Sequence, residues 1–223
     1  MCGRYTITIN ADTARQDLGI AEMPEDYHER YNVAPTQPVV VVADDESRKA
    51  EWMRWGLIPF WAKDPSIGSR LINARAETVA EKPAFKQAFA KRRCLILADG
   101  FYEWQKGAGA GGRSRPFLFK LEDDKPFAFA GLWDIWKDPE GEPLRTCTII
   151  TTEANALVRP VHERMPVMLS GDAMWAWLGL DSPKDLAALL KPYPAGAMKG
   201  YPVSARVNRT ELDIPDLVQP VAA

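Results

Sequence analysis

The sequence predicts an α+β fold, in which a single domain spanning residues 1–223 has a mostly antiparallel, open barrel-like core with helices at its periphery. Three observations support this prediction. Many short runs of β-branched and aromatic residues have the length and pattern of strands. Few segments have helical periodicity, and neither a repeat nor a clear linker divides the chain. Hydrophobic residues make up 46% of the chain, which is enough for a substantial core.

The predicted strands are short segments in which apolar residues alternate or run continuously. They cover residues 5–9, 39–42, 52–57, 94–98, 101–105, 116–121, 127–133, 145–152 and 201–205. The run 94–98 is apolar throughout, which indicates a buried strand. The Gly-rich segment 107–112 predicts a flexible hairpin loop and not a phosphate cradle, because no Gly-Lys-Ser/Thr follows it.

The predicted helices are few and short. Residues 12–18 have the pattern of a short helix, and residues 83–92 place apolar side chains on one helical face. Ser170 is a candidate N-cap, and Ser182-Pro183 starts a further helix. We expect the Pro-containing tail from Ile214 to be frayed.

Composition limits the class of protein. The three cysteines, Cys2, Cys94 and Cys147, are far apart and form no C-x-x-C pair, which argues against a disulfide framework and a zinc site. No run of about 18 apolar residues and no signal pattern occurs, so no membrane span is expected. We therefore expect a cytoplasmic monomer without metal or cofactor. The net charge of −2 neither indicates nor excludes nucleic-acid binding, which depends on a local basic surface.

Cys2 is the most informative residue. Because cysteine is small, Met1 should be removed after synthesis, which leaves Cys2 with an α-amine and a thiol on adjacent carbons. Such an aminothiol reacts with an aldehyde to form an imine, and the thiol then closes a thiazolidine ring. An α-amine titrates near ~7.7–8.0, so part of it is neutral and nucleophilic at physiological pH. The alternative is that Cys2 merely follows the start codon.

Seven blocks of the sequence, in order, resemble one protein family. They are residues 1–5 (MCGRY), 32–37 (NVAPTQ), 55–59 (WGLIP), 73–77 (NARAE), 100–104 (GFYEW), 130–133 (AGLW) and 162–166 (HERMP). Together they are similar to the SOS response-associated peptidase family, whose members are also called abasic-site processing proteins. The resemblance extends from Cys2 to about Arg206, nearly the whole chain.

The resemblance implies a DNA-damage function. Such proteins bind abasic sites in single-stranded DNA and link to the ring-opened sugar through the N-terminal cysteine, which shields the lesion. It implies that Cys2 is the nucleophile, that Asn73 positions its amine, and that Glu103 and His162 move protons at the imine and the sugar. It also implies peptidase chemistry at the protein's own N-terminus, lyase-type Schiff-base chemistry, and association with the nucleoid when DNA is bound. Taken alone, Asn73 could be a turn residue, Glu103 a surface charge and His162 a capping residue.

Further residues are candidates for contacts with DNA. They are Arg4, Asn32, Pro35, Trp61, Arg75, Arg164 and Met165. The arginines would bind phosphates beside the lesion. The other four would form a wall or wedge that splays the bases, because aromatic stacking is worth about 1–3 kcal/mol per base. For Trp61, packing in the core is an equal alternative.

Two other functions remain open at this point. Cys2 and His162 could instead form a Cys–His thiol peptidase that acts on other proteins. The chain could also be a noncatalytic binder of single-stranded DNA. A covalent adduct that requires the aldehyde distinguishes these alternatives, because a simple binder forms none and a protease does not need the free amine. A host aminopeptidase could equally remove Met1.

Overall fold

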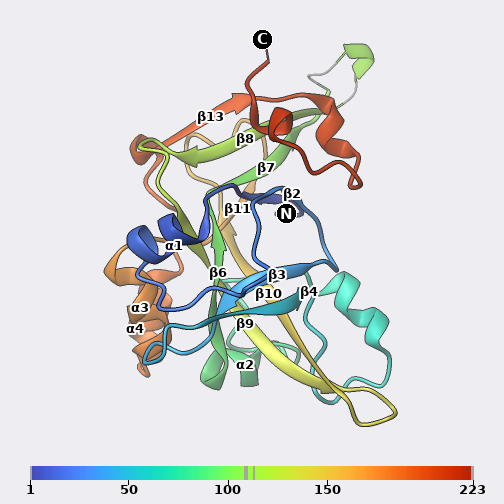
Figure 1. The fold of residues 1–223 in the computed structure, drawn as a ribbon, viewed down its shortest axis with the longest axis vertical. Helices are drawn as coiled ribbons and strands as arrows, with labels where there is room; N and C mark the ends of the chain where they lie inside the picture. Colours follow the sequence, from blue (N-terminus) through green and yellow to red (C-terminus); the bar gives the residue numbers. More distant parts are fainter. Residues whose placement is uncertain (1, 108–109, 113, 222–223) are drawn as a thin grey trace.

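The computed structural model of the chain describes residues 2–107, 110–112 and 114–221, and its strands form two sheets (Figure 1). The smaller sheet has five strands in the order β13–β8–β7–β1–β2, and all neighbours are antiparallel. Its strands are β1 (Tyr5–Ile7), β2 (Arg30–Val33), β7 (Gly100–Gln105), β8 (Arg115–Leu121) and β13 (Met198–Pro202).

The larger sheet has eight strands and contains a closed barrel. Along the order β11–β10–β4–β3–β6–β9–β12, β10 also pairs with β9, so a ring of five strands closes. Strands β4 and β10 are parallel, and β5 adds a second parallel pairing to β10. The strands are β3 (Pro38–Val42), β4 (Ala50–Trp55), β5 (Asn73–Arg75), β6 (Arg93–Ala98), β9 (Phe127–Lys137), β10 (Pro143–Glu153), β11 (Arg164–Pro166) and β12 (Met168–Leu169).

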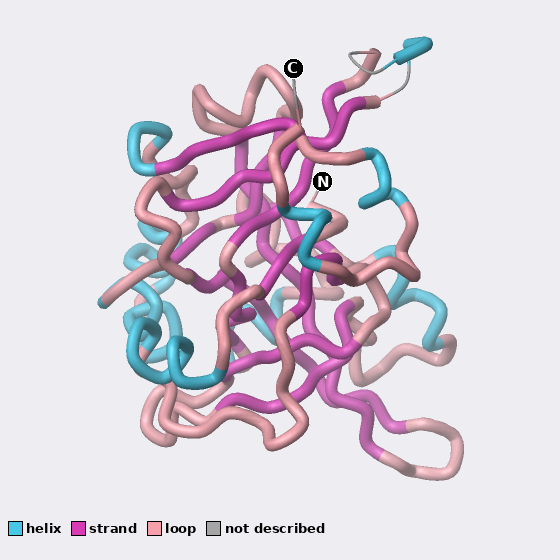
Figure 2. Tube along the Cα trace, turned by 45° about the horizontal axis from the view of Figure 1, so that its top comes forward, coloured by secondary structure: helices cyan, strands magenta, loops and turns pink. Residues whose placement is uncertain are grey.

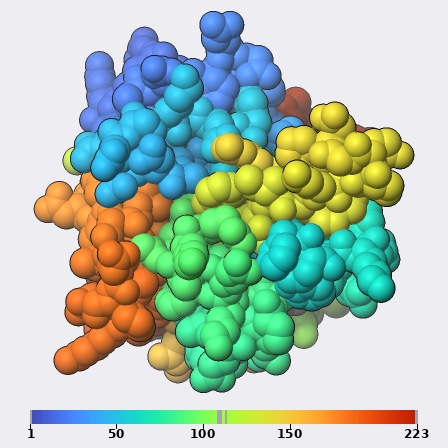
Figure 3. All heavy atoms as spheres, turned by 90° about the horizontal axis from the view of Figure 1, so that it is seen from below, coloured from blue at the N-terminus to red at the C-terminus, as the bar shows by residue number. Residues whose placement is uncertain are grey.

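The helices lie outside the strands, as the cyan segments of Figure 2 show. They are α1 (Ala11–Leu18), α2 (Lys86–Lys91), α3 (Asp172–Gly179) and α4 (Pro183–Leu189), with the 3₁₀ helices η1 (Pro65–Arg70), η2 (Ala110–Gly112), η3 (Ala195–Ala197), η4 (Ala205–Asn208) and η5 (Pro215–Val218). In Figure 3, the α2 segment (green) lies between the α3–α4 segment (orange) and the η1 segment (cyan). In Figure 1, α2 lies at the bottom of the barrel, α3 and α4 lie on its left and η1 (cyan) lies on its right.

Aromatic side chains connect the two sheets. Tyr5 of β1 is buried and packs edge-on against Trp55 of β4 and Phe129 of β9, with 5.5 Å between ring centroids in both pairs. Such aromatic contacts contribute about 0.5–1.5 kcal/mol each beyond the area that they bury. The N-terminal strand is therefore fixed against the barrel at the point where the two sheets meet.

Gly56, directly after β4, and Gly68 of η1 are in backbone contact. Gly56 has φ +120°, and a Cβ added there would lie 2.7 Å from the carbonyl oxygen of Gly68 in η1. A Cβ on Gly68 would lie 2.8 Å from the carbonyl oxygen of Gly56. The backbones thus meet with no side chain between them, which fixes both ends of the loop that carries Phe60 and Trp61.

The predicted α+β fold is confirmed, with peripheral helices around a β-rich core. The barrel is closed where an open one was expected, because β10 pairs with strands on both sides. Helix α4 starts at Ser182-Pro183 as predicted, and the Ser182 side chain accepts from the Asp185 N–H. The predicted N-cap at Ser170 is wrong, because α3 has Gly171 as its N-cap. Residues 108–109 of the predicted Gly-rich loop lie outside the described residues.

The C-terminal segment differs from the predicted frayed tail. Leu217 of η5 is fully buried, and Val221 N–H donates to the Pro202 carbonyl at 3.0 Å. The cause is a small apolar cluster in which Val207 and Leu217 pack with Tyr102 and Leu118. Nowhere in the described part of the chain is a helix long and apolar enough to span a bilayer.

Candidate active site

Cys2 and Glu103 are adjacent because β1 and β7 pair. Tyr5 lies opposite Phe101, and the Tyr102 N–H donates to the Arg4 carbonyl at 2.9 Å, which continues the pairing toward Cys2. The Cys2 side chain is fully buried. Burial raises the pKa of its thiol, and the charge of Glu103 raises that pKa further. The sulfur is therefore a protonated thiol at neutral pH.

Glu103 is suited to exchange a proton at neutral pH. Its side chain is only 2% exposed, and this burial raises the pKa of the carboxyl from 4.5 to about 7. A hydrogen bond from the Trp104 backbone opposes the shift. General acids and bases work best when their pKa is close to the operating pH, so this carboxyl can act as either.

Asn73 offers an unused acceptor. It starts β5, opposite Ile149 of β10, and its Nδ2 donates to the Ile72 carbonyl at 2.8 Å. Its Oδ1 is buried and has no hydrogen-bond partner among the described residues. An unsatisfied buried acceptor is costly, and at a functional site it indicates a group that a reactant or a water satisfies. A cavity of about 450 Å³ lined by Asn73, Arg75 and Phe85 opens beside it.

His162 lies just before β11 and is half-buried, and burial lowers its pKa. Its Nδ1 faces both backbone groups of Arg164, accepting from the N–H at 3.0 Å when unprotonated and lying 3.2 Å from the carbonyl oxygen. Strand β7 reaches this loop, because Gln105 Nε2 donates to the Pro160 carbonyl at 3.2 Å. Strand β7 therefore connects buried Glu103 to the loop that precedes His162.

The arginine candidates have different environments. Arg75 is exposed beside the cavity at Asn73. Arg164 makes a bidentate ion pair with Glu77, with distances of 2.6 and 3.0 Å, and it also donates to the Thr151 carbonyl at 2.6 Å. This pair lowers the pKa of Glu77. A phosphate at Arg164 would therefore compete with Glu77, whereas Arg75 is accessible.

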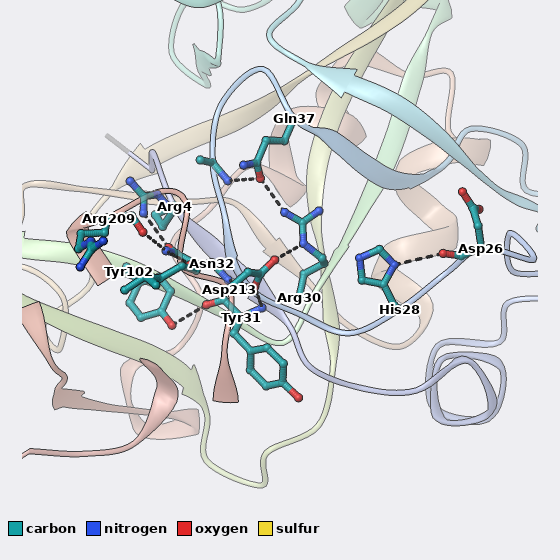
Figure 4. A network of polar contacts seen from close by, with 12 residues as sticks. Arg4, Asp26, His28, Arg30, Tyr31, Asn32, Gln37, Tyr102, Arg209 and Asp213 are labelled. Atoms are coloured by element: carbon teal, nitrogen blue, oxygen red, sulfur yellow. Dashed lines mark hydrogen bonds and ion pairs between the residues drawn. The ribbon is translucent and has the colours of Figure 1, made fainter. Parts of the chain in front are cut away.

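Arg4 and Asn32 lie inside the protein (Figure 4). Arg4 donates to Asn32 Oδ1 at 2.7 Å and to the Val207 carbonyl at 2.6 Å, and its guanidinium lies 5.9 Å from the Trp104 ring centroid. Both residues thus hold the C-terminal segment in this structure. The sequence predicted that both residues contact DNA. Because both are buried, that prediction requires the DNA strand to reach them inside the protein.

The remaining candidates for a wall or wedge against the DNA bases differ in their exposure to solvent. Pro35 is half-buried and Trp61 is 50% exposed, so Trp61 does not pack in the core. Met165 is fully buried, and its sulfur accepts from the Asn155 N–H at 3.4 Å. Phe60, which the sequence reasoning did not single out, is 52% exposed next to Trp61. The sequence feature that could have indicated Phe60 is the pair of consecutive aromatic residues, Phe60-Trp61.

The four candidate catalytic residues therefore come from both sheets. Cys2 and Glu103 come from the five-stranded sheet, and Asn73 comes from β5 on the edge of the barrel strand β10. His162 precedes β11, the next neighbour of β10. Across the residues that the structure describes, no group of three or more His, Cys, Asp or Glu side chains could hold a metal ion.

Comparison with known proteins places the chain in a family. A family model described as SOS response associated peptidase (SRAP) matches residues 1–210. Abasic site processing protein YoqW from Bacillus subtilis is 44% identical over 225 residues, covering 98% of this chain and 99% of that protein. Abasic site processing protein HMCES from Gallus gallus is 33% identical over 265 residues, covering 99% of this chain and 78% of that protein. A crystal structure of a protein from Bacteroides thetaiotaomicron has a TM-score of 0.88 and 28% identity, and the match covers 99% of this chain and 100% of that chain. The resemblance inferred from the sequence motifs is thus confirmed, and the chain belongs to the SOS response associated peptidase (SRAP) family.

Proposed function

We propose that this protein processes abasic sites in DNA and captures them covalently in single-stranded DNA through Cys2, after removal of Met1. The relatives named abasic site processing proteins support the target. The observation that carries the chemistry is the buried Cys2 beside Glu103, whose pKa is raised to about 7. An aminothiol beside a group that exchanges protons at neutral pH is suited to capture an aldehyde.

The capture proceeds in two steps that need no oxidant or reductant. The Cys2 amine attacks the C1′ aldehyde of the ring-opened deoxyribose, and the resulting carbinolamine loses one water to give an imine. The thiol then adds across the C=N bond, so that a C–S bond forms, the thiol gives up its proton, and the nitrogen ends as a neutral N–H. The product is a thiazolidine, and the sum of protein and DNA has lost one water.

Glu103 can serve both steps. In its protonated form it donates to the departing hydroxyl, and the resulting carboxylate accepts the proton of the Cys2 thiol. This cycle matches the protonated state of the thiol, which burial maintains. Asn73 Oδ1 would accept a hydrogen bond from the amine without holding it as an ammonium, as a carboxylate would.

His162 would move protons at the sugar and activate water for reversal. A Schiff base makes the neighbouring C2′ proton more acidic, and its removal by a base would break the strand in a lyase-type elimination. Ring closure removes the C=N bond, so the adduct shields the strand from this reaction. The same imine therefore leads either to protection or to cleavage, and the speed of thiol addition decides between them.

Removal of Met1 is a separate step, performed by the protein itself or by a host aminopeptidase. A general Cys–His thiol peptidase is less compatible with the site. Such enzymes use a thiolate that a cationic partner stabilises. Here burial raises the pKa of the Cys2 thiol and lowers that of His162, so both changes oppose an ion pair.

The proposed function is tested by incubating the mature protein with single-stranded DNA from which uracil has been excised. Denaturing electrophoresis should reveal a heat-stable adduct, and mass spectrometry should place it on the N-terminal peptide with the loss of one water. DNA with intact bases is the first control, and Cys94→Ala is the matched control because Cys94 is an equally buried thiol. An adduct on another residue, or equally fast reaction of protein that retains Met1, would overturn the proposal.

A further inference from the structure

The C-terminal strap, defined as residues 203–221, packs on the five-stranded sheet near the start of the chain (Figure 1). Figure 4 shows its residues Arg209 and Asp213 beside Arg4 and Asn32. Its two 3₁₀ helices, η4 and η5, bury Val207 and Leu217. The family match ends at residue 210, so the second half of the strap lies beyond it. The polar contacts of this half reach toward Cys2.

Asp213 is the main polar anchor between the strap and β2. Its carboxylate accepts from the backbone N–H groups of Tyr31, at 2.5 Å, and Asn32, at 2.9 Å, and it pairs with the Arg30 guanidinium. Strand β2 is the edge of the five-stranded sheet, where backbone donors lack a neighbouring strand. The Asp213 side chain takes the place of that neighbour and fixes the backbone at Asn32.

Asn32 passes this constraint to Arg4. Its Nδ2 donates to strap carbonyls, those of Leu212 at 2.7 Å, Arg209 at 3.0 Å and Val207 at 3.3 Å. Its Oδ1 accepts from Arg4 Nη1 at 2.7 Å, and the same Nη1 donates to the Val207 carbonyl at 2.6 Å. Both acceptors of this guanidinium nitrogen therefore depend on the contact between the strap and β2.

Arg4 in turn fixes the backbone next to the nucleophile. Only Gly3 separates Arg4 from Cys2 in the sequence. The Arg4 carbonyl accepts from the Tyr102 N–H at 2.9 Å. A backbone hydrogen bond from Arg4 lowers the pKa of the Cys2 thiol, against the larger effect of burial. A displacement of Arg4 would move the thiol relative to Glu103, the residue that follows Tyr102 in β7.

We infer that Asp213 is a positioning residue for Cys2, acting through Asn32 and Arg4. This inference rests on the proposed function, because it concerns the geometry of the same capture reaction. The strap also covers apolar surface, so a simpler role would be stability alone. The two roles of Asp213 differ in one respect. If Asp213 positions Cys2, its effect on the capture rate requires Arg4, whereas an effect on the stability of the fold alone does not.

The test measures single-turnover capture of uracil-excised single-stranded DNA at saturating DNA, with the full-length mature protein. Asp213→Asn should slow capture at least about tenfold, because misplacement of a reacting group by about 1 Å can cost about 100-fold. Asp213→Glu keeps the charge and should recover part of the rate. Glu211→Gln is the matched control: Glu211 lies in the same strap and bonds Arg209 at the surface at 2.8 Å. The control should stay within about twofold of the wild type.

A double-mutant cycle separates positioning from stability. In an Arg4→Ala background, Asp213→Asn should cause no further slowing, because its effect passes through Arg4. Equal slowing in both backgrounds, or a wild-type rate for Asp213→Asn, would overturn the inference while the proposed function stands. Absence of any adduct with wild-type protein would instead overturn the proposed function.

If melting curves show that Asp213→Asn does not fold, the Asp213→Glu variant tests the inference in its place. Slower capture with an unchanged melting temperature supports positioning, and an unchanged capture rate overturns it.

Discussion

Strands β6 and β7 are consecutive in the chain, yet they belong to different sheets and have opposite characters. Every residue of β6 is buried, and the strand pairs with β3 and β9 inside the barrel ring. Strand β7 pairs with β1 and β8 and carries Glu103, a buried carboxyl with a raised pKa. The barrel therefore supplies stability, and the small sheet supplies the carboxyl that we propose as a reactive group, whose burial is itself a cost.

This difference teaches how the fold keeps its reactive groups in place. A buried carboxyl is tolerated in the small sheet because Tyr5 fixes that sheet to Trp55 and Phe129 of the barrel. Substitutions in β6 should therefore change stability more than chemistry. Substitutions at Cys2 and Glu103 should change chemistry more than stability.

The largest expected effect is at Cys2. Cys2→Ala should abolish the heat-stable adduct, because no thiol remains to close the ring. The variant keeps an α-amine, so borohydride should still trap an imine. Denaturing gels with and without reduction measure both outcomes. A heat-stable adduct without reduction would place the linkage elsewhere.

Glu103→Gln should slow adduct formation by about 10²–10⁴-fold, the usual cost of losing a general acid or base. The wild-type rate should rise as the α-amine deprotonates toward ~7.7–8.0. It should fall where Glu103 loses its proton, above a pKa of about 7. The variant should lose this alkaline decline. Rates measured from pH ~5.5 to ~8.5 check the prediction, and an unchanged profile removes Glu103 from the mechanism.

Leu95→Ala tests the other half of the comparison, that substitutions in β6 change stability and leave the chemistry unchanged. Leu95 is fully buried in the barrel, so the truncation should lower the free energy of unfolding by about 2–5 kcal/mol. The capture rate of the folded protein should stay close to that of the wild type. Urea denaturation and single-turnover kinetics give the two values. A capture defect as large as that of Glu103→Gln would mean that the barrel does more than support the site.

The difference in stability between Glu103→Gln and the wild type should depend on pH in a definite direction. The folded pKa of about 7 lies above the ordinary 4.5, so the neutral form stabilises the fold below about 4.5. That contribution is lost as pH rises through about 7. Relative to wild type, the glutamine variant should gain roughly 3 kcal/mol between pH ~4.5 and ~8. A melting-temperature difference that does not change over this range would contradict the raised pKa.

Arg75→Ala has the smallest expected effect. Arg75 is exposed beside the cavity at Asn73, where it can reach a phosphate. Its loss should reduce the salt dependence of single-stranded DNA binding by about 0.7 per phosphate contact and slow capture mainly at low DNA concentration. Binding titrations at several salt concentrations measure the slope, with Lys137→Ala, at the end of the β9–β10 hairpin, as an exposed control. An unchanged slope would exclude Arg75 from the phosphate contacts.

The sequence predicted most of the strands, but it missed β2, β5, β11 and β12, which have only two to four residues each. The continuous apolar run of residues 94–98 indicated the buried strand β6, because the hydrophobic pattern reports which residues leave water. Barrel closure could not be predicted, since it depends on the parallel pairing of Thr146 in β10 with Arg54 in β4. Local pattern carries no information about a partner so distant in the chain.

The candidate site shows the same division. Cys2, Glu103 and His162 could be named from motifs, and the structure gives each a buried or half-buried position. The burial of Arg4 could not be foreseen, because a charged residue near a chain end is ordinarily exposed. Its acceptor is the Val207 carbonyl, 203 positions later, and only the folded strap creates it.

The contact between Gly56 and Gly68 has a consequence for how this sequence can vary. A side chain at Gly56 would strike the carbonyl oxygen of Gly68, and one at Gly68 would strike that of Gly56. A larger residue at either position therefore requires the two segments to separate, which would move the loop bearing Phe60 and Trp61. Homologues should change both positions together with the intervening loop length, and loop grafts should exchange residues 56–68 as one unit.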